Sequence, residues 1–184
     1  MQRFSGIVLG LLLGWGSGVV LVAEASEVDM RLAQTDPRLQ EASTLYETGK
    51  TLREQGNYPE ALATLKQTLT AYEALEDSRG IAQTLVQLGK TYDGLGDYES
   101  MGASYQRALE IAKASGDKQQ EAYALNGVGD IYFYQQQYEE AQPYYEEALA
   151  IFEALGDDLG KAESLLFIGN NYYWGLQNYE AAEP

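Results

Sequence analysis

Apolar and small residues recur along most of the chain at spacings of three and four, which places them on one side of amphipathic helices. One phrase, Ala-x-x-Leu-x-x-apolar-Gly-x-x-apolar, returns every forty residues and contains Gly49, Gly89, Gly129 and Gly169. Only the first copy departs from it, with Thr48 at the apolar position. A fixed period of this size is typical of repeat arrays and favours a binding scaffold over an enzyme.

A second helix is predicted in each of the first three units. Tyr58, Tyr98 and Tyr138 each stand nine residues after a repeat glycine, behind the turn residues at 56–57, 96–97 and 136–137. Each unit therefore reads as helix A, a tight turn, helix B and a polar loop. Asp36 and Pro37 are a typical helix start, so the folded region should begin there. The sequence predicts an all-α solenoid of antiparallel helix pairs, with units at 37–76, 77–116 and 117–156 and an incomplete unit at 157–184.

Glycine in the middle of helix A costs about 1 kcal/mol relative to alanine. Its recurrence predicts that a neighbouring backbone passes where a side chain would stand. Helix B of the same unit is the expected neighbour, with Ala61 and Ala141 facing the contact.

The first 25 residues differ from the rest. Arg3 precedes an apolar run from Ile7 to Val22, and Ala23 and Ala25 are small residues two apart, as at a signal cleavage site. This predicts a cleaved signal peptide and an exported protein, with an uncleaved membrane anchor over 7–22 as the alternative. The run has 16 residues, whereas a membrane-spanning helix needs about 20. Residues 26–36 form a polar linker.

Composition removes several classes of function. The formal charge is −16, which disfavours nucleic acid as a partner. Without cysteine or histidine, disulfides, thiolate metal sites, cysteine nucleophiles and Ser-His-Asp relays are excluded. We expect no catalytic residue, no metal site and no cofactor. The acidic residues concentrate after position 118, where Lys161 is the one base, and they are expected to form a solvated face.

These residues resemble the tetratricopeptide repeat (TPR), which has Leu, Gly, Tyr, a small residue, an aromatic and Ala at matching offsets. The matching residues are Leu85, Gly89, Tyr92, Met101, Tyr105 and Ala108 in the second unit, and Leu125, Gly129, Tyr132, Ala141, Tyr145 and Ala148 in the third. The forty-residue period is similar to the longer variety found in kinesin light chains and in bacterial exported proteins that carry a caspase-like CHAT domain. Met101 departs from the pattern, and few of the family's helix-A asparagines are present.

The resemblance implies a right-handed superhelix of about 3.5 repeats that grips peptide segments on a concave face lined by the A helices. By position, the groove candidates are Lys50, Arg53, Gln83, Lys90, Tyr123, Asn126, Asp130, Phe133, Asn170 and Tyr173. Lys50 and Lys90 would suit an acidic group or a C-terminal carboxylate, although both could simply face solvent. Among the late aromatic residues, Tyr132, Tyr145 and Tyr172 fit packing positions, whereas Tyr173 and Trp174 could be exposed.

The fourth unit predicts helix A from about Asp158 to Trp174, then a turn, but the sequence given stops before helix B. Repeats bury their apolar faces against neighbours, so Leu165, Ile168 and Tyr172 should be partly exposed. We expect either that self-association or a partner covers this unit, or that the chain is the N-terminal adaptor or sensor segment of a longer enzyme, such as a CHAT-type peptidase. The main expectation is a non-catalytic scaffold that binds protein segments.

Overall fold

A computed structural model describes residues 36–182 of the chain, with side chains described as far as Gly175. The predicted signal peptide or anchor and nearly all of the linker lie outside these residues. None of the helices within the described part is both long and apolar enough to span a bilayer.

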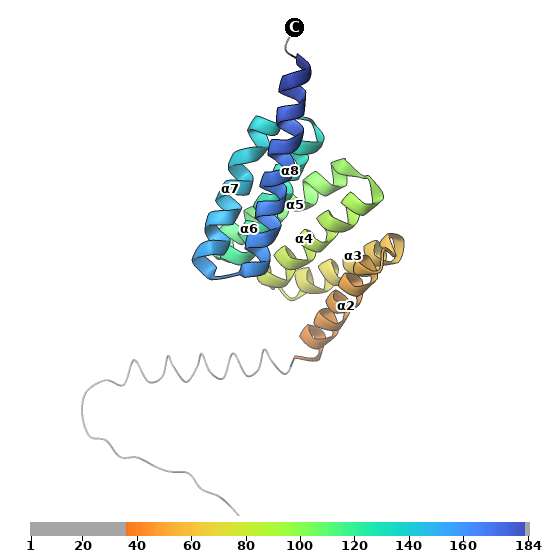
Figure 1. Ribbon diagram of the computed structural model, residues 1–184. Helices are drawn as coiled ribbons and strands as arrows, with labels where there is room; N and C mark the ends of the chain where they lie inside the picture. Colours follow the sequence, from red (N-terminus) through yellow and green to blue (C-terminus); the bar gives the residue numbers. More distant parts are fainter. Residues whose placement is uncertain (1–35, 183–184) are drawn as a thin grey trace, which may run out of the picture. The chain divides into compact units, whose positions relative to one another are not determined.

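Seven helices and no strands make up the described residues (Figure 1). They are α2 (Pro37–Glu54), α3 (Tyr58–Ala74), α4 (Ser78–Leu95), α5 (Tyr98–Ser115), α6 (Lys118–Tyr134), α7 (Tyr138–Leu155) and α8 (Asp158–Ala182). The even-numbered helices correspond to the predicted A helices, and α3, α5 and α7 correspond to the B helices. The predicted helix start at Pro37 is confirmed.

Short capped turns separate the helices. Asp77, Asp117 and Asp157 each accept a hydrogen bond from the backbone amide three residues later, which satisfies an open donor at the start of an A helix. Between α4 and α5, Gly96 has a φ of 72° and closes the helix in the left-handed conformation. Gln136 stands forty residues later and has a φ of 62° in the equivalent turn between α6 and α7.

The repeat glycines of α2, α4 and α6 make room for a large side chain of the following helix. A Cβ atom at these positions would lie 2.7 Å from Leu65 Cγ for Gly49, 2.6 Å from Tyr105 Cζ for Gly89 and 2.5 Å from Tyr145 Cε1 for Gly129. The nearest atoms are therefore side chains of the following helix and not the predicted backbone, although the Leu65 backbone nitrogen also lies 3.5 Å from the Cβ position at Gly49. Leu65, Tyr105 and Tyr145 are themselves buried. Ala61 and Ala141 are fully buried as well.

Other glycines fit the faces between successive units. The ring of Tyr105 lies against Gly89 of its own unit and also against Gly127 of the next. Gly80 and Gly160 admit Tyr72 and Phe152 in the same way. The Tyr105 ring thus contacts both α4 and α6, so its position depends on two units.

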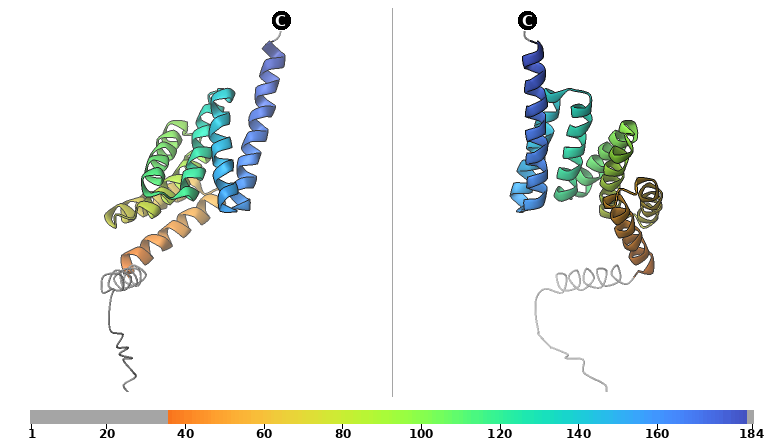
Figure 2. Two further views of the ribbon diagram at one scale, coloured as in Figure 1. Left: turned by 90° about the vertical axis from the view of Figure 1, so that its left-hand side faces the viewer. Right: turned by 45° about the vertical axis from the view of Figure 1, so that its right-hand side comes forward.

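The A helices line the inner side of the array. Each contacts the next A helix, α2 with α4, α4 with α6 and α6 with α8, whereas no comparable contact joins successive B helices among the described residues. The stacked pairs are visible in Figure 2. This arrangement makes the inner face of α2, α4, α6 and α8 the place where side chains of all units converge.

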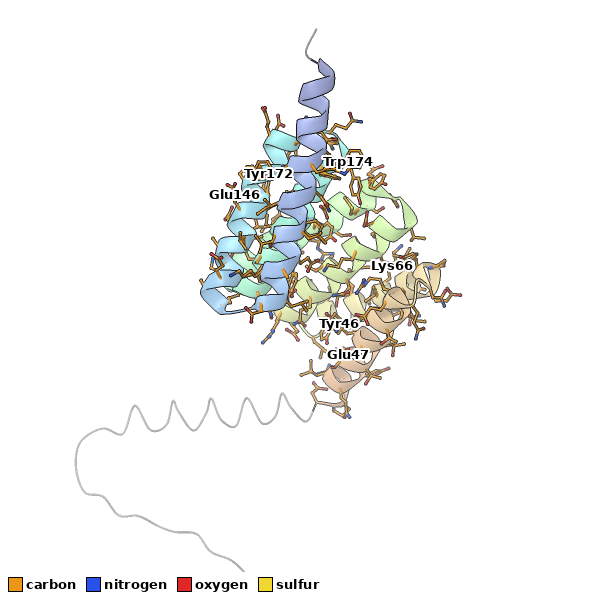
Figure 3. The ribbon with its side chains drawn as sticks, viewed as in Figure 1. Tyr46, Glu47, Lys66, Glu146, Tyr172 and Trp174 are labelled. Atoms are coloured by element: carbon orange, nitrogen blue, oxygen red, sulfur yellow. The ribbon has the colours of Figure 1, made fainter. Side chains whose placement is uncertain are left out.

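Helix α8 differs from the other A helices. It continues to Ala182, past the end of α7 (Figure 2), so the turn predicted after Trp174 is wrong. Among the described residues, no atom of another helix lies within 4 Å of a Cβ placed at Gly169, because no helix B of this unit packs there. Leu165 is 48% exposed and Tyr172 is 54% exposed, so the partial exposure predicted for this unit is confirmed, whereas the packing position assigned to Tyr172 is wrong (Figure 3). Ile168 is half-buried.

Candidate functional site

Two neighbouring cavities open on the inner face of the array. The first, here called the central cavity, has a volume of about 380 Å³ and is lined mainly by α4, α6 and α8. The second, the side cavity, has about 330 Å³ and lies mainly between α2, α4 and α6. Arg53, Lys90, Tyr123 and Glu163 line both of them. Volumes of this size are in the range of about 300–1,000 Å³ that ligand sites commonly have.

The predicted groove residues gather around these cavities, with one exception. Asn126, Asp130, Phe133 and Asn170 line the central cavity, Lys50 and Gln83 line the side cavity, and Arg53, Lys90 and Tyr123 line both. Tyr173 lines neither cavity and is exposed on α8. Tyr46 of α2 is a further wall of the side cavity (Figure 3).

An ion pair crosses the inner face from α4 to α8. Lys90 Nζ lies 2.6 Å from Glu163 Oε1, and the same ammonium group lies 5.1 Å from the centre of the Tyr123 ring. Because its charge is already satisfied within the chain, Lys90 is not simply facing solvent.

Glu163 lines both cavities but is not among the predicted groove residues. A signal for it was present, because Glu163 stands forty residues after Tyr123 and eighty after Gln83, two positions that the pattern did place on the inner face. The repeat spacing alone would have added it to the groove candidates.

Asp130 is the most perturbed acid of the site. Tyr145 donates a hydrogen bond of 2.8 Å from its hydroxyl to Asp130 Oδ1. Burial raises the pKa of Asp130 to about 7, with further increases from the carboxylates of Asp93 and Glu163, while the Tyr145 hydrogen bond and Lys90 act in the opposite direction. Asp130 therefore changes its charge near neutral pH.

Tyrosine hydroxyls around the site remain protonated at neutral pH. Burial, followed by the charges of Asp157 and Glu163, raises the pKa of Tyr123 to about 12. Burial is also the main cause that raises the pKa of Tyr105 and Tyr145. These groups can donate hydrogen bonds and offer ring faces, but they do not supply an ionised nucleophile.

Amide and hydroxyl groups fix α6 against α8. Asn126 Nδ2 donates to Ser164 Oγ at 2.9 Å, and the Ser164 hydroxyl lies 3.2 Å from Asn126 Oδ1. Both residues are buried, so this Asn126 contact holds the wall of the cavity in place. Asn170, in contrast, is exposed at the rim.

No group of three or more aspartate, glutamate, histidine or cysteine side chains is arranged to hold a metal ion within residues 36–175. The side chains that do converge are suited to hydrogen bonding, ion pairing and ring stacking. They line two adjoining cavities on the inner face of a helical solenoid.

The sequence identifies which solenoid family this is. The family profile for the tetratricopeptide repeat matches residues 40–114, 80–154 and 120–184, and the chain belongs to this family. A comparison with curated proteins found no significant match.

Solved structures share the fold at low sequence identity. The TPR domain of Arabidopsis FLU is 22% identical with a TM-score of 0.57, over 64% of this chain and 99% of that one. Aspartyl phosphate phosphatase F from Bacillus subtilis is 20% identical with a TM-score of 0.69, and the match covers 88% of this chain but 42% of that protein. BtubC (BKLC) from P. vanneervenii is 24% identical with a TM-score of 0.61, over 85% of this chain and 65% of its own. The chain thus spans only part of the last two proteins.

Proposed function

We propose that this protein is a non-catalytic scaffold whose inner face binds an extended or helical segment of a partner protein. The observation that carries the proposal is the convergence of side chains from all four A helices on the two adjoining cavities. TPR folds are generally protein-interaction modules, which agrees with this role.

The chemistry of the inner face suits a peptide. Half-buried rings such as Tyr123 and Phe133 offer apolar area, and Asn170 and Gln83 offer polar groups at the rims. Aromatic residues combined with a few polar groups are typical of the parts of interfaces that contribute most to affinity. Because α6 and α8 are tied by buried hydrogen bonds, the surface is largely preformed, which lowers the entropy lost on binding.

A display selection tests the proposal. The full chain is used to select binders from a random twelve-residue peptide library, and the dissociation constants of synthetic copies are measured by fluorescence anisotropy. Asn170→Trp places a large ring at the exposed rim of the central cavity, whereas Gln106→Trp places the same ring on an exposed position of α5.

We expect Asn170→Trp to weaken the selected peptides at least tenfold and Gln106→Trp to leave them unchanged. If no peptide is selected, or if both variants bind as the unchanged protein does, the inner face is not the binding surface.

A second role is favoured by the exposed apolar residues of α8. Leu159, Leu166 and Tyr173 are 74%, 62% and 58% exposed, and large exposed apolar areas commonly mark association surfaces. We propose that a second copy of this chain packs on α8. Leu166→Asp should then shift sedimentation at micromolar concentration toward the monomer, while Leu95→Asp on α4 should not. A concentration-independent monomer before mutation would contradict this role.

A further inference from the structure

The basic side chains around the central cavity have partners within the chain, whereas two of its acidic side chains form no ion pair. Its two basic residues are both engaged: Lys90 pairs with Glu163 at 2.6 Å, and Arg53 donates from Nε to Gln87 Oε1 at 2.9 Å. Asp93 and Asp130, which line the same cavity, form no ion pair with any residue among those the structure describes. The cavity therefore contains two carboxylates that form no ion pair among the described residues, although Lys90 acts on Asp130 at longer range.

Two helices supply these carboxylates and the aromatic rings beside them. Asp93 lies near the end of α4, and Asp130 is held on α6 by the hydroxyl of Tyr145. Phe133 and Tyr134 follow on α6 and line the cavity with them. The Tyr134 hydroxyl forms a hydrogen bond with Asp93, and burial, followed by this contact, raises the pKa of Tyr134.

Rings of this array already accept cations. Lys90 Nζ lies 5.1 Å from the centre of the Tyr123 ring, and Lys66 Nζ lies 5.8 Å from that of Tyr92. Both distances are within the range of about 6 Å at which a cation is attracted to a ring face. A partly desolvated space that combines such rings with unpaired carboxylates is complementary to a long basic side chain.

We propose that the central cavity takes a lysine or arginine side chain of the bound segment, with Asp130 and Asp93 as its carboxylate partners and aromatic rings as its walls. The inference rests on the proposed function, because the basic side chain is delivered by a segment lying on the inner face. It assigns the partner a definite chemistry, a positive charge at one position, whereas Lys90 is reserved for Glu163.

The charge of Asp130 adds a pH dependence to this recognition. Asp93 and Lys90 face it from α4, Tyr145 from α7 and Glu163 from α8. A bound cation favours the ionised carboxylate, so binding below the pKa of about 7 must expel a proton. Affinity for a basic segment should therefore rise between pH 6 and pH 8, by up to about tenfold.

The experiment uses peptides selected from the random library by the full chain, with dissociation constants measured by fluorescence anisotropy. Each arginine is replaced in turn by citrulline and each lysine by N-acetyl-lysine, which remove the charge with little change of shape. The same measurements are made with Asp130→Asn, Asp93→Asn and the control Glu147→Gln, which removes an exposed acid of α7. Asparagine at position 130 can still accept the Tyr145 hydrogen bond, so we expect this variant to fold.

We expect selected peptides to share a basic residue whose neutralisation weakens binding about tenfold or more. In Asp130→Asn and Asp93→Asn that penalty should fall severalfold, and Glu147→Gln should keep it in full. Peptides that bind, respond to Asn170→Trp and carry no critical basic residue would overturn this inference and leave the proposed function standing. An equal loss of affinity on neutralising the basic residue in all variants would also overturn this inference and leave the proposed function standing. Failure to select any peptide would contradict the proposed function itself.

Discussion

Helices α6 and α8 are built from the same sequence phrase and end up in different surroundings. Ala122, Leu125 and Gly129 are buried in α6, whereas Ala162, Leu165 and Gly169 are exposed in α8. The difference lies in the neighbours: α6 packs against α5, α7 and both adjacent A helices, whereas α8 packs mainly against α7 and α6. A repeat phrase thus specifies which residues can be buried, but the next helix decides whether they are.

The largest difference in stability should come from a buried tyrosine packed on α6 compared with an exposed tyrosine of α8. Tyr145, 1% exposed beneath Gly129, should cost about 3–5 kcal/mol of unfolding free energy when changed to alanine, because a fully packed ring is lost. Tyr172→Ala removes an exposed ring of α8 and should cost less than about 1 kcal/mol. Urea denaturation followed by circular dichroism measures both, and equal losses would remove the contrast drawn between the helices.

The repeat glycines offer a second test. Gly129→Leu forces four carbon atoms into space that the Tyr145 ring occupies and should destabilise the fold by about 2 kcal/mol or more. Gly169→Leu meets no atom within 4 Å at its Cβ, and it should be neutral or stabilise α8 by up to about 1 kcal/mol, since leucine forms helices better than glycine. Both are read from the urea midpoint. A tolerated Gly129→Leu would show that the ring can move aside.

A third test uses the position after each repeat glycine, which is Asp130 in α6 and the exposed Asn170 in α8. The folded-state pKa of Asp130 is raised to about 7, above its ordinary value of 3.8. Between about pH 4 and pH 7, the folded state therefore holds a proton on Asp130 that the unfolded state has lost. The resulting contribution to stability is complete below pH 4 and disappears as the pH rises through 7.

Asp130→Asn should consequently stabilise the protein relative to the unchanged chain by an amount that grows between pH 5 and pH 8, to about 2 kcal/mol. Thermal unfolding across this range measures the difference. Glu147→Gln is the control and should follow the unchanged chain at every pH. A constant difference for Asp130→Asn would mean that the carboxyl group is ionised in the fold throughout the range.

The smallest change in stability is expected in the turn between helix A and helix B, which the second and third units have and which α8 does not form. Gln136 adopts a φ of 62°, which side chains other than glycine rarely adopt, and Gly96 holds the equivalent place with a φ of 72°. Gln136→Gly should raise stability by about 0.5–1 kcal/mol, and Gly96→Gln should lower it by about 1 kcal/mol. Calorimetric unfolding temperatures decide both signs, and a loss of stability in Gln136→Gly would mean that its side chain contributes contacts that outweigh the strain.

Much of the fold was predictable, because one period repeated four times constrains helix identity, helix boundaries and the inner face together. The turn signals at 96–97 and 136–137 marked helix ends that the structure confirms. The continuation of α8 was not predictable from the repeat, since Gly175 and Asn178 resemble the punctuation of the earlier turns. The spacing of residues within α8 does not show whether another helix follows and packs against it, and so it does not show where α8 ends.

The sequence predicted which residues line the candidate site better than it predicted their contacts and charge states. Positions forty residues apart share a face, so the repeat spacing alone assigns Lys90, Asp130 and Asn170 to one surface. The state of each side chain depends on distances between helices that spacing does not contain. Whether Lys90 is paired and whether Asp130 is neutral depend on how closely α4, α6 and α8 approach one another.

The contact between Lys90 and Glu163 has a mechanical consequence. In a repeat array, each unit usually contacts only the next one, so the rotation between one pair of units is independent of the rotation between the following pair. Lys90 and Glu163 are 73 residues apart in sequence, so their ion pair links the second unit directly to the fourth and passes over the third. Dissolved salt weakens such a bond to the extent that water reaches it. We therefore expect a high salt concentration to weaken the contact between Lys90 and Glu163 and to let α4 and α8 move more freely relative to each other.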